Sequence, residues 1–106
     1  MLIEVTKDNI MHGIQESEID CPIALAVCDA VESELDDNSI EQCNVIACVH
    51  DNDISVHFHH PDEMKYQYNI SPKSKCEWKV INDFIHRYDT GQDVEPFDME
   101  FEVIQN

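Results

Sequence analysis

The chain has 106 residues, and its 23 acidic residues against six Lys and Arg give a formal net charge of −17 at pH 7. Because nucleic acids and anionic membranes are themselves polyanions, this charge excludes direct binding to either and favours a strongly basic partner. The hydrophobic content of 42% and the apolar segments that recur along the chain are typical of a folded protein, and the length fits a single acidic domain over residues 1–106.

The N-terminal part of the chain predicts a strand followed by a helix. Apolar and polar residues alternate over residues 2–6, as in a half-buried strand. After a polar connection over residues 11–18, Pro22 suits the first position of a helix, because its missing N–H would be unpaired there anyway. The helix is predicted to end at residues 36–39. Its apolar stripe comprises Ala24, Val27, Cys28, Val31 and Leu35, and its opposite side carries Asp29, Glu32 and Asp36.

Three strands joined by short turns are predicted next. Residues 43–49 are rich in β-branched and small side chains, whereas residues 54–59 and 64–70 alternate between apolar and polar side chains. Turn-forming residues separate them at positions 50–53 and at Pro61. Strands linked in this way form an antiparallel meander.

A second helix and a last strand complete the chain. The helix is predicted over residues 72–89, since Ser74 and Glu77 have the spacing of a capping box and Gly91 follows the apolar periodicity. Residues 97–103 alternate again and form the last strand. The order β-α-β-β-β-α-β predicts a two-layer α+β domain, in which a mostly antiparallel five-stranded sheet carries two helices on one face.

Two segments near the ends of the chain resemble a family of short uncharacterised proteins from phages and bacteria. Residues 20–26, D-C-P-I-A-L-A, are similar to the C-P-I-A-L helix of that family. The pattern over residues 84–97 leads into Pro96-Phe97 and Phe101, which is similar to its terminal P-F-x-x-x-F strand. The matching motifs are structural and leave the middle of the chain unmatched, so the resemblance implies a fold and a phage origin but no activity.

The cysteines and the N-terminus bear on the compartment. The N-terminus lacks a basic start followed by a long apolar run, so no secretory signal is predicted, and no segment reaches membrane-spanning length. We therefore expect a cytoplasmic protein, in the host cytoplasm if phage-encoded, whose thiols are reduced and act mostly as small buried apolar groups. The five cysteines, none of them in a C-x-x-C motif, are Cys21, Cys28, Cys43, Cys48 and Cys76.

A histidine-rich strand is the main candidate for a metal site. His57 and His59 share one face of the predicted strand, His60 follows directly, and His50 and Asp53 lie across the hairpin. No Cys or carboxylate stands at a recognised ligand spacing, however, and a solvated outer face explains the pattern more simply. We predict no metal and no other cofactor, with a small metal- or ligand-binding module as the alternative function.

Enzyme signatures are missing from the sequence. It contains no Gly-rich phosphate loop, no H-E-x-x-H motif and no nucleophile elbow. Cys76, close to Lys75 and Lys79 near the start of the second helix, is the best candidate nucleophile. No histidine partner can be inferred for it, so we predict a protein without catalytic residues.

The acidic residues are unevenly distributed. Residues 1–64 hold fifteen acidic residues and one basic residue, whereas residues 65–106 hold eight and five. Acidic residues at i and i+2 on a strand lie about 6.6–6.8 Å apart, and those at i and i+3 or i+4 on a helix lie about 5–6 Å apart. Both spacings are comparable to that of successive phosphates. The candidate partner-binding residues form a helix row, Asp29, Glu32, Asp36 and Asp37, and a strand row, Asp98, Glu100 and Glu102.

These features lead to a functional hypothesis. We expect a non-enzymatic, phage-encoded DNA mimic that binds the basic nucleic-acid-binding surface of a host defence protein, as anti-restriction and anti-CRISPR proteins do. An acidic interaction subunit of a host complex is a further alternative. A homodimer is a secondary expectation, formed through an edge strand or through the second helix, with Lys73, Lys75 and Lys79 facing the acidic surface of the other copy.

Overall fold

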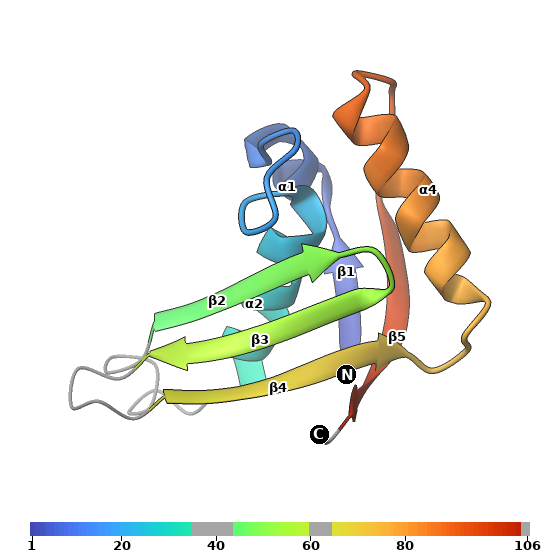
Figure 1. The fold of residues 1–106 in the computed structure, drawn as a ribbon. Helices are drawn as coiled ribbons and strands as arrows, with labels where there is room; N and C mark the ends of the chain where they lie inside the picture. Colours follow the sequence, from blue (N-terminus) through green and yellow to red (C-terminus); the bar gives the residue numbers. More distant parts are fainter. Residues whose placement is uncertain (35–43, 60–64, 105–106) are drawn as a thin grey trace.

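Five antiparallel strands form one sheet in the order β1-β5-β4-β3-β2, and three helices of the described part of the chain pack with it (Figure 1). This architecture comes from a computed structural model that describes residues 1–34, 44–59 and 65–104. It confirms the predicted α+β fold. In chain order the elements are β1 (Leu2–Val5), α1 (Lys7–His12), α2 (Pro22–Glu34), β2 (Asn44–His50), β3 (Asp53–His59), β4 (Lys65–Pro72), α4 (Glu77–Asp89) and β5 (Phe97–Ile104).

The sheet is strongly curled, and α2 lies inside the curl. Strands β2, β3 and β4 run across Figure 1, whereas β1 and β5 stand steeply beside them. Helix α2 contacts β1 and β2, which are the two edge strands of the sheet. The helix therefore spans the gap between the two edges, so that one apolar face of the curled sheet closes around it.

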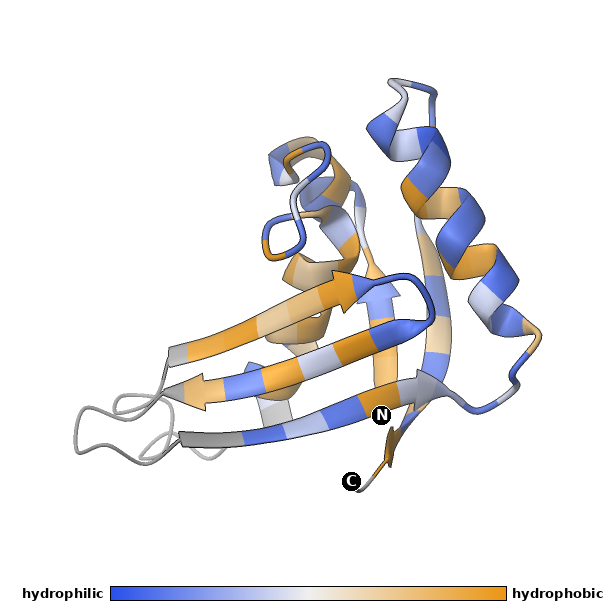
Figure 2. Ribbon diagram, viewed as in Figure 1, coloured by the Kyte–Doolittle hydropathy of each residue, from blue (hydrophilic) through white to orange (hydrophobic). Residues whose placement is uncertain are grey.

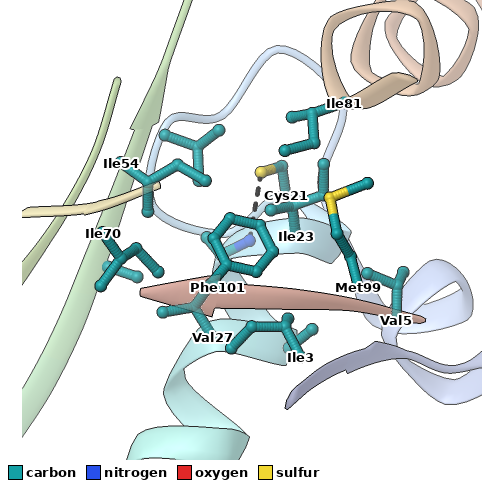
Figure 3. Close-up of a cluster of buried hydrophobic side chains, with 14 of the residues drawn as sticks. Ile3, Val5, Cys21, Ile23, Val27, Ile54, Ile70, Ile81, Met99 and Phe101 are labelled. Atoms are coloured by element: carbon teal, nitrogen blue, oxygen red, sulfur yellow. Dashed lines mark hydrogen bonds between the residues drawn. The ribbon is translucent and has the colours of Figure 1, made fainter. Parts of the chain in front are cut away.

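The apolar residues of the alternating sequence patterns contribute to the buried core, and the polar residues between them are more exposed. On β5, the buried Met99 and Phe101 alternate with the exposed Asp98 and Glu100, and the same alternation of apolar and polar residues is visible along the ribbon in Figure 2. Burial of such side chains stabilises the fold by about 1.5–3 kcal/mol each. Figure 3 shows side chains from four of the strands, from α2 and α4, and from the residue before α2 converging on this core: Ile3, Val5, Cys21, Ile23, Val27, Ile54, Ile70, Ile81, Met99 and Phe101.

Helix α1 was not predicted from the sequence. It begins with a capping box, in which the Asn9 backbone N–H donates to Thr6 Oγ1 at 3.1 Å and the Thr6 backbone N–H donates to Asn9 Oδ1 at 2.9 Å. The box uses Asn at its fourth position, where Glu or Gln is the usual sequence signal. With only six residues, the helix is also too short to show an apolar periodicity.

The start of the second predicted helix was placed too early. Ser71 and Pro72 belong to β4, where they pair with Glu102 and Phe101 of β5, and the helix α4 begins only at Glu77. The predicted capping box is not formed, because the Glu77 backbone N–H donates to the Ser74 carbonyl at 3.0 Å. Pairing across the sheet therefore extends the strand beyond the point that the local pattern indicated.

Candidate functional site

The predicted strand row lies on the outer face of the sheet, opposite the helices. Asp98, Glu100 and Glu102 are exposed, while their neighbours Met99 and Phe101 point into the core. The register places Glu4 of β1 directly opposite Asp98. The structure thus adds one carboxylate to the row, and we call the resulting group the outer-face cluster: Glu4, Asp98, Glu100 and Glu102.

The charges of the outer-face cluster are only partly neutralised. Glu100 Oε2 lies 3.4 Å from the Met1 amino group and 4.0 Å from Lys73 Nζ. Exposed pairs of this kind stabilise a protein by about 0–1 kcal/mol. Within the part of the chain that the structure describes, no ion pair involves Glu4, Asp98 or Glu102. These three carboxylates therefore remain available to a basic partner.

The helix row has a different environment. Asp29 Oδ2 accepts a hydrogen bond of 3.0 Å from Asn9 Nδ2, and this bond ties α2 to α1. Glu32 is exposed on the same helix. The predicted residues Asp36 and Asp37 lie outside the described residues. Of the two rows, the strand row is the one that the structure describes completely. Asp29 and Glu32 lie on α2, on the other side of the sheet from the strand row.

The histidine strand is described only in part. His57 Nε2 lies 2.9 Å from Ser55 Oγ, so the ring is held within its own strand. His50 Nδ1 lies 3.6 Å from Glu18 Oε1. His60 and the side chain of His59 are outside the description. Among the described residues, no group of three His, Cys, Asp or Glu side chains is arranged to hold a metal ion.

The described cysteines are free, and two of them are shielded. Burial raises the pKa of the Cys21 thiol, and the nearby Asp89 carboxylate adds to this shift. Burial likewise raises the pKa of Cys28 on α2. Cys76, in contrast, is exposed, and its Sγ lies 2.9 Å from Ser74 Oγ. Cys21 and Cys28 therefore have the environment expected of apolar core groups, whereas Cys43 is not among the described residues.

Alkylation of the native protein should distinguish these thiols. We expect Cys76 to react with iodoacetamide at least about ten-fold faster than Cys21, because thiolate formation at Cys21 is suppressed and its access is blocked. Peptide mass spectrometry of timed samples measures both rates, and the denatured chain is the control, in which the rates should converge. Equal native rates would contradict the described burial.

The stability of the protein should also depend on pH through these thiols. Since the pKa values of Cys21 and Cys28 are raised in the folded protein, the thiols of the unfolded chain should ionise at a lower pH. The free energy of unfolding should therefore fall as the pH rises above about 8.5.

A second acidic feature was missed at the sequence level. A pocket of about 330 Å³ is lined by Glu16, Glu18, Asp51 and Asp89, with Cys21 on its wall. The Glu16 backbone N–H donates to Asp89 Oδ1 at 2.8 Å, which joins the segment before α2 to the end of α4. These carboxylates come from three distant parts of the chain, and no spacing in the sequence indicates that they meet.

Comparison with known proteins adds no relative to this description. The chain matches no model of a protein family and shows no significant similarity to a curated protein or to a solved structure. The resemblance to short phage and bacterial proteins therefore stays a prediction. None of the described helices combines the length and the apolar character needed to cross a membrane. The features that define the chain are thus its curled α+β fold and its acidic outer face.

Proposed function

We propose that the protein is a non-enzymatic, phage-encoded inhibitor that acts in the host cytoplasm by binding the basic nucleic-acid-binding surface of a host defence protein. The observation that carries this proposal is the outer-face cluster. Its four carboxylates stand on two paired strands, exposed to solvent and opposite the packed face of the sheet. A folded domain with net charge −17 presents them as a fixed negative surface.

The spacing of the cluster supports mimicry of a nucleic-acid backbone. Asp98, Glu100 and Glu102 are alternate residues of one strand, so their Cα atoms are about 6.6–6.8 Å apart. Glu4 lies opposite Asp98 on the neighbouring strand, so the negative surface extends over two strands. The backbone hydrogen bonds of the sheet hold these positions, so little backbone entropy is lost when a basic surface docks on them. A negative field of this strength speeds encounter with a positive patch and weakens as salt rises.

Charge reversal should identify the contact surface. In the double variant Asp98→Lys and Glu102→Lys, affinity for the partner should fall by roughly ten-fold or more, since each change replaces an attraction with a repulsion. The matched control is Asp83→Lys with Asp93→Lys, which makes the same change in net charge at exposed residues elsewhere. The partner is recovered by pull-down from host lysate, and affinity is measured by titration at two salt concentrations.

Competition with DNA tests the inhibitory part of the proposal. Added DNA should displace the protein from its partner, because both occupy one basic surface. The proposal fails if the recovered partner lacks a basic surface, or if it binds DNA and this protein together with no loss of either. Equal loss of affinity in the test and control variants would mean that net charge, and not the outer-face cluster, governs binding.

A further inference from the structure

The two edges of the sheet differ in how their backbone groups are satisfied. On the β2 edge, the Val49 N–H donates to the Glu18 carbonyl at 2.8 Å, and the Cys28 thiol donates to the Val45 carbonyl at 3.6 Å. The segment before α2 and the helix itself therefore occupy this edge. Another strand cannot pair with β2 without breaking these contacts.

The β1 edge is open over two residues. The Phe101 N–H donates to the Met1 carbonyl at 2.8 Å, and hydrogen-bonded pairs alternate along an antiparallel ladder. The backbone groups of Ile3 and Val5 therefore face β5, and those of Leu2 and Glu4 face away from it. Within the described residues no hydrogen bond reaches the outward groups of Leu2 and Glu4. This edge offers two N–H donors and two carbonyl acceptors.

A groove runs along this open edge. It lies between β1 and α2, has a volume of about 280 Å³, and is lined by Leu2, Glu4, Ala26, Asp29, Ala30 and Ser33. The helix contributes small side chains to the lining, so it leaves room for the side chains of an added strand. Leu2 remains 45% exposed and provides an apolar contact at the mouth.

The negative charge of the groove determines which kind of segment can bind in it. Glu4 and Asp29 border it, and no basic residue is part of its described lining. A second copy of the chain would bring a second charge of −17 and another Glu4 to the same edge. Repulsion of this kind disfavours pairing of two β1 strands, whereas an extended segment rich in Lys or Arg would be attracted.

We propose that the β1 edge binds an extended basic segment of a partner protein by strand addition. The segment pairs its backbone with Leu2 and Glu4, places one Lys or Arg side chain beside Glu4 on the outer face, and directs its alternate side chains toward Ala26 and Ala30. The inference rests on the proposed function for the charge of the partner, and it adds a second contact next to the outer-face cluster.

A synthetic peptide provides the test. The probe is an eight-residue peptide of alternating Lys and Val with both termini blocked, and the matched probe replaces Lys with Glu. We expect the basic peptide to slow amide hydrogen exchange at Leu2 and Glu4 by at least ten-fold, as measured by NMR, and the acidic peptide to leave both rates unchanged. Protection that appears without peptide and grows with protein concentration would instead show pairing of two copies, and would overturn the proposal.

Two charge-neutral variants separate strand addition from simple attraction. Leu2→Pro removes the outward N–H without removing a ladder bond, because edge positions of this kind tolerate proline. Ala30→Met fills the groove from the helix side and leaves the backbone of β1 unchanged. Each should weaken peptide binding by at least ten-fold while the partner's salt-dependent binding to the outer-face cluster remains. Unchanged peptide binding in both variants overturns strand addition but leaves the proposed function standing. Equal binding of the acidic and basic peptides overturns the basic character of the segment.

Discussion

Replacement of Phe101 by Ala should destabilise the protein by about 3–5 kcal/mol, as is typical when a large aromatic side chain is removed from a core. Phe101 is only 2% exposed, and it lies on β5 between β1 and β4. Its ring belongs to the same buried cluster as Ile3, Ile23 and Val27 (Figure 3). Since small domains have a total stability of about 5–15 kcal/mol, the variant should be partly unfolded at moderate urea concentrations. Urea titration followed by circular dichroism measures the loss.

A second site on the same strand provides the control for this prediction. Val103 lies two residues after Phe101 on β5 and so on the same face of the strand, but its side chain is 51% exposed. Val103→Ala should therefore cost less than about 1 kcal/mol, which covers the intrinsic strand preference of valine. Similar losses in the two variants would show that Phe101 is not at the centre of the core.

The strands could be predicted because the alternation of apolar and polar residues in the sequence follows from the alternation of buried and exposed side chains along a strand. Alternation on β5 places Met99 and Phe101 on one side and the acidic residues on the other, whatever the partner strand is. The helix α2 begins at Pro22 as predicted. The preference for proline at the first helical position is local, because an N–H at that position would have no partner within the helix. Such features need only neighbouring residues to be recognised.

The features that were missed depend on contacts between distant parts of the chain. Pro72 was assigned to a helix by its sequence neighbours, but it pairs with Phe101 in the sheet. In the candidate site, too, the sequence revealed the local pattern but not the contacts between distant residues. The acidic row on β5 was visible as alternation, whereas the position of Glu4 beside Asp98 depends on pairing between the first and last strands. The role of Asp29 as a partner of Asn9 depends on α1, which the sequence did not predict.

The junction of α1, α2 and α4 is the second place where a single substitution should have a large effect. Gly13 follows α1, and an added Cβ would lie 2.7 Å from Cδ and Cγ of Pro22. The Tyr88 hydroxyl on α4 donates to the Gly13 carbonyl at 2.7 Å and to the Ile10 carbonyl at 3.1 Å. The backbone at Gly13 is thus held between α4 and the first residue of α2, and it has little room to move.

Gly13→Ala should therefore destabilise the protein by about 1–3 kcal/mol through overpacking, because the proline ring is rigid and cannot rotate away. The φ angle of Gly13 is −68°, which any residue adopts, so the cost is steric. Gly91 is the matched control, since its φ of +81° is unfavourable for a side chain while its nearest neighbour would be 3.8 Å away. Gly91→Ala should cost about 1–2 kcal/mol through backbone strain.

Asparagine separates the two causes, because it tolerates positive φ better than alanine but is larger. Gly91→Asn should be more stable than Gly91→Ala, whereas Gly13→Asn should be no better than Gly13→Ala. Urea titration of the four variants measures both differences. If Gly13→Ala were as stable as the parent chain, Pro22 would not approach Gly13 as closely as described, and the packing of α1 against the start of α2 would have to be revised.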